Sequence, residues 1–305
     1  MKKHYIIITI IFIVLVASLI YKKAPVNSDL PILEDGKTYN RIISLSPNIT
    51  EILFELGLEN KIVGVTNYCT YPEAAKKIAK IGGYFDPNFE AIVSLKPDLV
   101  LILPEQENVK QFLAELNLQY LIINNKTVSD IFAGIKTIGN TFEKAKLAKN
   151  LLFSLKSRLE KIKGETKNSD RPGVLISVGR ALGTGGLADV YAAGKDTYFD
   201  ELIKLAGAKN VVEINNIAYP LLSAEGIIYL NPDIIVDFAT DFEKQNLDEY
   251  QVINDWDALP DVNAVKNHRI YVRGQSYAVI PGPRFIILLE DMAQIFHPEI
   301  EWEEK

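Results

Sequence analysis

Hydrophobic and polar positions alternate along the chain in short blocks that predict strands followed by helices. From Arg41, the apolar run RIISL predicts a strand, and ITEILFELGL then follows helical period and ends at Gly57. KIVGV and LVLIL predict two further strands, and a predicted helix from Asn108 to Leu116 separates LVLIL from a strand at 120–123. Strands separated by helices indicate a parallel sheet with helices on both faces.

The longest helical pattern runs from about Phe142 to Lys163. Its apolar positions recur at steps of four and three: Leu147, Leu151, Leu155, Leu159 and Ile162. A second alternating series follows, with GVLISV, VVEI and RIYVR as strands, a glycine-rich loop at 179–186, and helices at 197–205 and 283–296. The chain is therefore predicted to have an α/β fold, with two Rossmann-like lobes of parallel sheets joined by one long α-helix.

Two stretches of the chain repeat each other at a constant offset of 135 positions. YFDPNFEAIVSLKPDLVL begins at Tyr84, and YPLLSAEGIIYLNPDIIV begins at Tyr219. Glu90 matches Glu225, Pro97 matches Pro232, and Asp98 matches Asp233. Such long shared spacing without a gap indicates two lobes of like construction.

The first 23 residues differ from the rest and predict an export signal or a membrane anchor. An uncharged span from Tyr5 to Tyr21 is flanked by lysine pairs, and its length leaves both readings open. No cysteine follows the span, so we expect no lipid attachment there, and the folded part should lie outside the cytoplasm, in the periplasm or at the cell surface. The predicted division is a signal or anchor at 1–23, a linker at 24–39, an N-terminal lobe at 40–139, an interlobe helix at 140–165 and a C-terminal lobe at 166–305.

Composition narrows the classes of function. The net charge of -6 and pI near 5.3 argue against nucleic-acid binding, because phosphate contacts need a basic surface. The single cysteine, Cys69, cannot form an internal disulfide. Beyond the N-terminal span the only histidines are His268 and His297, too few nitrogen and sulfur ligands for a zinc-type site. We therefore expect no metal bound directly by side chains and no cofactor.

Catalytic motifs are also missing from the sequence. The loop GRALGTGG lacks the spacing of a dinucleotide-binding motif, AGKDT does not form a P-loop, and no G-x-S-x-G occurs. Glycines for tight turns explain both glycine-rich segments. We therefore predict no catalytic residues, although an enzyme whose catalytic groups meet only in space stays an alternative.

Tyrosines beside predicted strand ends are the candidate ligand contacts. Tyr84 and Tyr219 occupy equivalent positions in the repeat, and Tyr68 and Tyr277 lie in loops next to predicted strands. Ligands bind at strand ends of open α/β sheets, and tyrosine offers a broad apolar face with one polar tip. Ordinary packing is the alternative for each ring; for the symmetric pair we favour ligand binding.

Glu90 and Glu225 have two interpretations. Near the start of a helix capped by Asn88 or Ser223, a carboxylate is stabilised by the helix dipole by roughly 0.3–1 kcal/mol. Two carboxylates at matching points of two lobes also form a pair of acidic knobs suited to a symmetric partner with basic pockets.

Several motifs in one order make the chain resemble a known family. They are RIISLSPNITEILFELG, VTNYCTYPEAA, EAIVSLKPDLVL, AGKDTYFDELIKLAGAKNV, YPLLSAEGIIYLNPDIIV and YAVIPGPRFIILLEDMAQIFHPE. From Arg41 to Glu299 the chain is similar to the extracytoplasmic substrate-binding proteins of ABC importers for cobalamin and iron chelates (siderophores and haem).

The resemblance implies a ligand held between the lobes and a monomer that delivers it to an ABC permease dimer in the inner membrane. Glu90 and Glu225 match the glutamates that dock into the permease. Where similar cobalamin binders present tryptophans, this chain has Tyr84, Tyr219 and Tyr277, which leaves the ligand open among corrinoid, siderophore and haem. Tyr84 would be a metal ligand only if the ligand were haem, and Arg180 could meet a ligand carboxylate.

The sequence therefore predicts an extracytoplasmic protein that captures a metal chelate, cobalamin or a ferric siderophore, and performs no chemistry of its own. The alternatives are a haem-binding protein of the same class, an extracytoplasmic enzyme on the same scaffold, and a tethered receptor.

Overall fold

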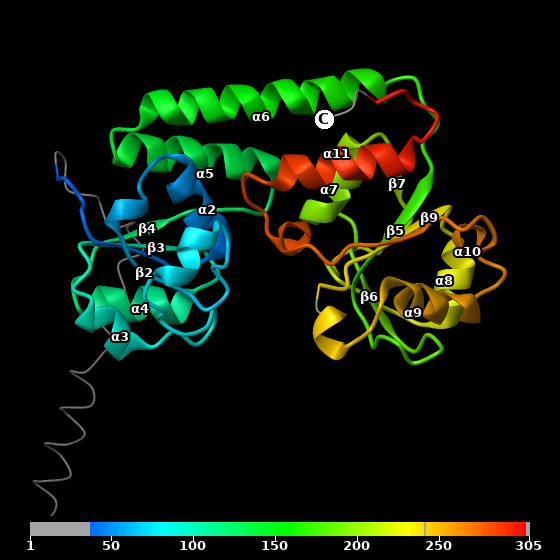
Figure 1. The fold of residues 1–305 in the computed structure, drawn as a ribbon, viewed down its shortest axis with the longest axis horizontal. Coiled ribbons are helices and arrows are strands. Elements are labelled where there is room, and N and C mark those ends of the chain that lie inside the picture. Colours follow the sequence, from blue (N-terminus) through cyan, green and yellow to red (C-terminus); the bar gives the residue numbers. More distant parts are fainter. Residues whose placement is uncertain (1–36, 241, 303–305) are drawn as a thin grey trace, which may run out of the picture. The chain divides into compact units, whose positions relative to one another are not determined.

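The computed structural model describes residues 37–240 and 242–302 (Figure 1). Its first sheet has the strand order β2-β1-β3-β4 and is parallel throughout. The strands are β1 (Ile42–Ser44), β2 (Ile62–Val65), β3 (Leu99–Ile102) and β4 (Tyr120–Ile122). The helical segments are α2 (Pro47–Glu55), η1 (Glu59–Lys61), η2 (Glu73–Lys77), α3 (Phe89–Ser94), α4 (Glu107–Glu115) and α5 (Val128–Thr141). We call the segment from β1 to α5 the N-terminal lobe.

The second sheet has the order β10-β9-β5-β6-β8, with β7 paired to β5. Its strands are β5 (Gly173–Gly179), β6 (Val190–Ala192), β7 (Lys209–Asn210), β8 (Leu221–Leu222), β9 (Ile234–Asp237) and β10 (Ile270–Val272). The helices are α7 (Tyr198–Leu205), α8 (Ala224–Leu230), α9 (Glu249–Asn254), α10 (Asn263–Lys266) and α11 (Phe285–Phe296), with short 3-10 segments η3 (Glu243–Gln245), η4 (Asp255–Ala258) and η5 (Ser276–Val279). We call the segment from β5 to α11 the C-terminal lobe.

The predicted α/β class is confirmed, but the second sheet is mixed where a parallel sheet was predicted. Strand β6 pairs antiparallel with both β5 and β8. The chain passes from β5 to β6 through the glycine-rich loop without a helix, and such a direct connection returns the chain antiparallel.

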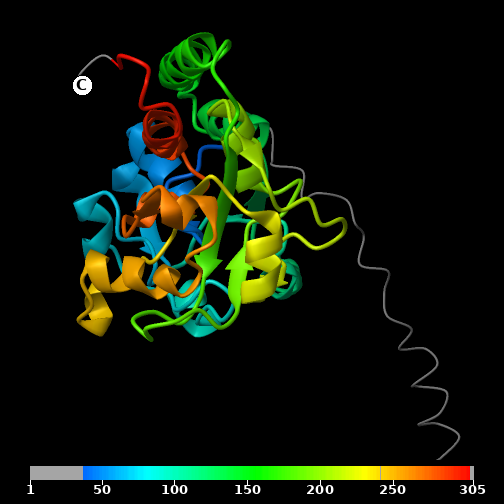
Figure 2. The same ribbon diagram turned by 90° about the vertical axis from the view of Figure 1, so that its right-hand side faces the viewer.

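The long helix α6 (Ala145–Glu165) lies along one side of both sheets, in contact with α5 and α11 (Figures 1 and 2). Leu155, Leu159 and Ile162 of the predicted stripe are buried, whereas Leu147 near the helix start is exposed. The helix begins later than predicted because Glu143, with φ of 56°, forms the turn that separates α5 from α6.

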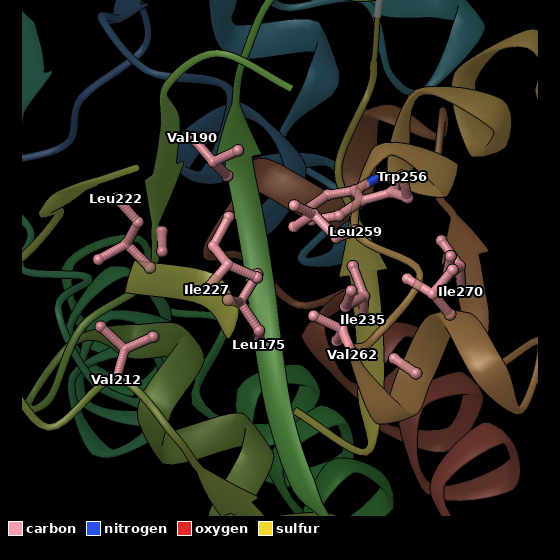
Figure 3. Packing of buried hydrophobic residues seen from close by; sticks show 13 residues of the cluster. Leu175, Val190, Val212, Leu222, Ile227, Ile235, Trp256, Leu259, Val262 and Ile270 are labelled. Carbon is pink, nitrogen blue, oxygen red and sulfur yellow. The ribbon is translucent and has the colours of Figure 1, made fainter. Parts of the chain in front are cut away.

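Each lobe has its own apolar core. In the N-terminal lobe, Ile43 and Val100 pack with Ile92 and with Leu113 of α4. In the C-terminal lobe, side chains gather along β5 and β9, with Trp256 fully buried among them (Figure 3). The removal of this apolar surface from water supplies the main stabilisation of each sheet.

The repeat has the same local structure in both lobes. Asn88 caps α3 by accepting a hydrogen bond from the Ala91 backbone N–H, and Ser223 caps α8 in the same way from Gly226. Downstream, the Asp98 carboxylate accepts the N–H of Arg41, just before β1, at 2.9 Å. The Asp233 carboxylate accepts the N–H of Gly173, which begins β5, at 2.8 Å. The repeated aspartates thus tie the helix-to-strand turn of each lobe to its central strand.

The described residues belong to one compact unit, so the boundaries between the lobes and the interlobe helix stay a prediction. The predicted signal or anchor at 1–23 and most of the linker at 24–39 lie outside the described residues. Within the part of the chain that the structure describes, no helix is long and apolar enough to cross a membrane.

Candidate ligand-binding cleft

A cavity of about 720 Å³ is lined by residues of both lobes. The N-terminal lobe contributes the segments that follow its strands: Asn48 after β1, Tyr68 after β2, Glu105 after β3 and Lys126 after β4. Parallel strands end at one edge of their sheet, so these segments meet there. This is the edge at which the sequence placed its candidate residues.

The C-terminal lobe supplies the other wall of the cavity. Its lining residues are 196–198 at the start of α7, Ala218 and Tyr219 ahead of β8, and 279–281 ahead of α11. Thr197 caps α7 by accepting the N–H of Asp200 and donates its hydroxyl to the carbonyl of Gly194. These two hydrogen bonds hold the start of α7 in place relative to the preceding loop at this wall of the cavity.

Tyr84 lines the cavity, and its hydroxyl already has a hydrogen-bond partner. The Tyr84 Oη donates to Glu105 Oε1 at 2.5 Å, and the ring packs edge-on against Phe85 with centroids 4.5 Å apart. Burial, together with the hydrogen bond to the Glu105 carboxylate, raises the pKa of Tyr84. The phenol therefore stays protonated and neutral.

Gln106 holds this part of the cavity in place, and sequence reasoning missed it. Its Nε2 donates to the carbonyl of Tyr84 at 2.8 Å and to that of Leu45 at 3.2 Å, while its Oε1 accepts the N–H of Leu103 at 2.9 Å. The side chain is buried and thereby links the loops that follow β1 and β3 to the loop of Tyr84. A lone glutamine in a loop belongs to no motif, so only the contacts reveal its role.

Tyr68 and Tyr219 also line the cavity, one from each lobe. Their side chains are 61% and 44% exposed, so their ring faces are accessible to a ligand. Burial raises the pKa of Tyr219. Together with Tyr84, these rings give the cavity aromatic walls with polar tips.

Tyr277 is not among the residues that line the cavity. The Arg284 guanidinium lies 5.6 Å from the Tyr277 ring centroid and 3.8 Å from that of Tyr71. Arg284 also pairs with Glu51 of α2, with Nη2 to Oε1 at 2.6 Å and Nε to Oε2 at 3.0 Å. Tyr277 therefore packs beside a charged pair, near the cavity wall formed by residues 279–281.

Arg180 lies away from the cavity, and the structure gives it a different partner set from the one we predicted. Its side chain is 1% exposed, and it donates to Asp237 at 2.8 Å, to Asp255 at 2.6 Å and to the carbonyl of Val252 at 2.7 Å. Buried charges need such partners, and here two carboxylates enclose one guanidinium. We therefore no longer propose Arg180 as a ligand contact.

Glu90 and Glu225 are exposed on α3 and α8 and do not line the cavity. Hydrogen bonds from its own backbone N–H and from the Ser223 hydroxyl lower the pKa of Glu225, so this carboxylate stays ionised. One helical turn beyond each glutamate lies an aliphatic side chain, Val93 or Ile228, and both are 46% exposed. The repeat therefore presents the same surface feature, an acid beside an apolar group, on both lobes.

The described residues contain no cluster of three or more histidine, cysteine or carboxylate side chains able to hold a metal ion. Cys69 is buried, and its sulfur contacts the hydroxyls of Thr50 and Thr66, each at 3.2 Å. What the cleft offers is a concave surface of aromatic rings with a few polar groups. Such a surface suits a bulky ligand held without covalent change.

Two α/β lobes with a ligand-sized cavity lined by both define the class of a bilobal binding protein. Residues 42–277 match the periplasmic binding protein family. The chain belongs to this family and is a substrate-binding protein.

Three known proteins illustrate the relationship. An uncharacterized ABC transporter substrate-binding lipoprotein of Bacillus subtilis, YvrC, is 33% identical over 90% of this chain and 84% of its own length. A vitamin B12-binding protein of Vibrio vulnificus is 24% identical over 84% of this chain and 89% of its own. A solved structure described as a possible iron-binding (periplasmic solute-binding) protein of Staphylococcus epidermidis is 30% identical, covers 85% of this chain and 99% of its own, and has a TM-score of 0.71.

Proposed function

We propose that the protein captures a metal chelate, a corrinoid or a ferric siderophore, between its lobes and delivers it to an ABC permease. The observation that carries this proposal is the cavity of about 720 Å³ with aromatic residues from both lobes. Its volume lies within the range of roughly 300–1,000 Å³ that small-molecule sites occupy. Relatives named for ABC transport, vitamin B12 and iron support the ligand class. Haem is the alternative ligand.

The proposed ligand contacts are Tyr68, Tyr84 and Tyr219. A corrin ring or a siderophore presents wide apolar edges and several amide or carbonyl groups, which match tyrosine rings and hydroxyls. A titration of the purified full-length chain with cyanocobalamin, ferric siderophores and haemin, followed by visible absorbance and tyrosine fluorescence, tests this assignment. Turnover of an added substrate without binding of any chelate would favour the alternative of an enzyme.

For the permease contact, we propose the two acidic knobs formed by Glu90 and Glu225. Both are exposed, both stand on equivalent helices, and each has an exposed aliphatic neighbour one turn away. A carboxylate at the centre with an apolar flank is suited to a basic pocket in a partner. Two such knobs fit a partner made of two like subunits.

Charge reversal tests the docking assignment. The double variant Glu90→Lys, Glu225→Lys is expected to abolish ligand delivery to the permease in a reconstituted uptake assay, because two attractive contacts become repulsive. Ligand affinity should stay within about twofold, since neither residue lines the cavity. The double variant Glu59→Lys, Asp257→Lys makes the same change of charge at exposed positions of both lobes and should transport normally. Loss of ligand affinity in the first variant, or loss of transport in the second, would count against the assignment.

We also propose that the protein works outside the cytoplasm, tethered or exported by the apolar span from Tyr5 to Tyr21. The Bacillus subtilis relative is named a lipoprotein, whereas the single cysteine of this chain, Cys69, is buried in the N-terminal lobe. A protein span in place of a lipid would keep the binding protein close to its permease. Immunoblotting of membrane and released fractions against a size standard of the full-length chain distinguishes a retained span from a cleaved signal.

A further inference from the structure

We infer that the ligand of this cleft is a neutral or cationic chelate whose metal has no open coordination position. This inference rests on the proposed function and narrows it: it favours a corrinoid or a hydroxamate-type ferric siderophore. It disfavours haem and polyanionic siderophores. Two independent observations support it, namely the charges that line the cavity and the hydrogen bond of Tyr84.

Among the described residues that line the cavity, the ionisable acids and bases other than tyrosine are Glu105, Asp196 and Lys126. The cavity is therefore lined by two carboxylates and one ammonium group. An anionic ligand transferred from water into this space would lose hydration and gain a single cation in return.

Arg284 and Arg180 already have carboxylate partners within the protein. The guanidinium of Arg284 forms two hydrogen bonds with Glu51. That of Arg180 is enclosed by Asp237 and Asp255. Breaking either pair to bind a ligand carboxylate would leave a buried charge uncompensated. The two propionates of haem thus find no free guanidinium among these residues.

The second observation concerns groups that could bind an open metal site. Haem iron is held in proteins by histidine, cysteine, methionine or tyrosine. No histidine, cysteine or methionine is found among the described residues that line this cavity, so tyrosine is the available donor type. A tyrosine binds ferric iron as the anion, and a carboxylate already in contact with its hydroxyl opposes that form through like-charge repulsion.

The environment of Tyr84 disfavours the anionic form of its side chain. Its hydroxyl donates to the Glu105 carboxylate at 2.5 Å, and ionisation would place two anions in contact. The other tyrosines that line the cavity are Tyr68, Tyr198 and Tyr219, and burial raises the pKa of Tyr198 and of Tyr219. The tyrosines are therefore suited to contacts with ring faces and amide groups, and not to metal ligation.

Cyanocobalamin and ferrioxamine-type chelates meet these conditions. Their metal positions are filled by their own ligands, and they carry no net negative charge. Their amide and carbonyl groups can accept hydrogen bonds from the hydroxyls of Tyr68 and Tyr219, and the side-chain amides of Asn48 and Asn125 line the same cavity.

Equilibrium dialysis of the purified full-length chain against four probes tests the inference. The probes are cyanocobalamin, ferrioxamine B, ferric enterobactin and haemin, each followed by its own visible absorbance. At least one of the first two is expected to bind tenfold or more tightly than both of the last two. Tightest binding of haemin or ferric enterobactin would overturn the inference while upholding the proposed function. Failure of all four to bind a chain that is folded by circular dichroism would contradict the proposed function itself.

A variant pair tests the physical cause. Glu105→Gln removes one cavity carboxylate and the charged acceptor of Tyr84, and is expected to tighten ferric enterobactin or haemin about tenfold, the scale of one nearby charge. Glu115→Gln makes the same change on the exposed surface of α4 and is expected to have no effect. An equal change in both variants, or none in Glu105→Gln, would contradict the role of the cavity charges.

Discussion

Arg180 shows how surroundings decide the role of a single residue. From the sequence it is an arginine in a glycine-rich loop, and such a residue is commonly exposed and available to a ligand. Its partners Asp237 and Asp255 lie 57 and 75 positions further along the chain. The residues next to Arg180 in the sequence give no indication of these two partners, so the buried charge cluster could not be predicted without the fold.

The Arg180 cluster leads to a prediction about stability. Arg180→Ala is expected to lower the free energy of unfolding by about 3–5 kcal/mol, because two buried carboxylates lose their cation. Urea denaturation followed by circular dichroism measures the loss. Lys76→Ala, which breaks an exposed pair with Glu73, should cost less than about 1 kcal/mol. Equal effects of the two substitutions would show that the cluster contributes no more than a surface pair.

The same cluster predicts a dependence of stability on pH. Burial alone would raise the pKa of Asp255, but hydrogen bonds from Arg180, Gly185 and Gly183 lower it below the ordinary 3.8. A lowered folded pKa gives stability that is present above the unfolded value and lost as the pH falls through the folded one.

Unfolding free energies measured between pH 6 and pH 3 should therefore fall below about pH 4 in the wild type. The fall should be smaller in Asp255→Asn, which has no carboxylate to protonate. Asp257→Asn, two residues further on and exposed, should retain the wild-type slope. The idea fails if Asp255→Asn and Asp257→Asn show the same slope.

At the scale of helices and strands, most of the fold was predictable from the periodicity of apolar residues and from helix-capping residues. The strands β1, β2, β3, β5, β9 and β10 and the helices α2, α3, α4, α7 and α11 lie where the apolar runs and helical patterns placed them. Strands β6 and β8 were not predicted: β6 follows the glycine-rich loop and has an exposed residue between two buried ones, and β8 has only two residues. The predicted strand VVEI at 211–214 is wrong: the structure has the short β7 just ahead of it, and pairing to β5 ends at Asn210.

Close packing of α5 against α6 depends on Gly139, whose role the sequence alone does not indicate. A Cβ on Gly139 would overlap the side chain of Ala148, whereas a Cβ on Gly164 would meet open space. Gly139→Ala should therefore lower the free energy of unfolding by about 1–3 kcal/mol through overpacking.

Gly164→Ala provides the matched control on the same pair of helices. It should raise the free energy of unfolding by a few tenths of a kcal/mol up to about 1 kcal/mol, because alanine loses less backbone entropy in a helix. Thermal and urea unfolding of both variants give the comparison. Opposite signs are expected, and two losses of equal size would contradict the packing argument.

At the scale of the whole molecule, polar contacts connect segments far apart in sequence. Glu51 pairs with Arg284, Arg158 of α6 pairs with Glu290 of α11, and the N–H of Val128 donates to Glu201 of α7. The pair of Glu51 and Arg284 spans 233 positions and joins α2 to the start of α11. The contacts of Glu51 with Arg284 and of Val128 with Glu201 join the two lobes, which favours a cleft of defined width, and the pair of Arg158 and Glu290 joins α6 to the C-terminal lobe.

The ligand cleft was partly predictable at this scale. Strand-end loops and the internal repeat indicated Tyr68, Tyr84 and Tyr219, and the structure brings all three to one cavity. Glu105 and Gln106 could not be foreseen, because their roles depend on how the loop after β3 meets the loop of Tyr84. Spacing predicts which edge of a sheet carries a site, whereas the polar contacts within it require the folded arrangement.

Capture of a chelate in the cavity between the lobes is tested most directly by the dissociation constant of the best-bound chelate for three full-length proteins: the wild type, Ala218→Trp and Ala114→Trp. Ala218 lines the cavity, and Ala114 is an exposed residue of α4 outside it. Filling the cavity with an indole should weaken binding at least a hundredfold, while the surface substitution leaves it unchanged. Equal affinity of all three proteins would contradict the assignment of this cavity as the ligand site.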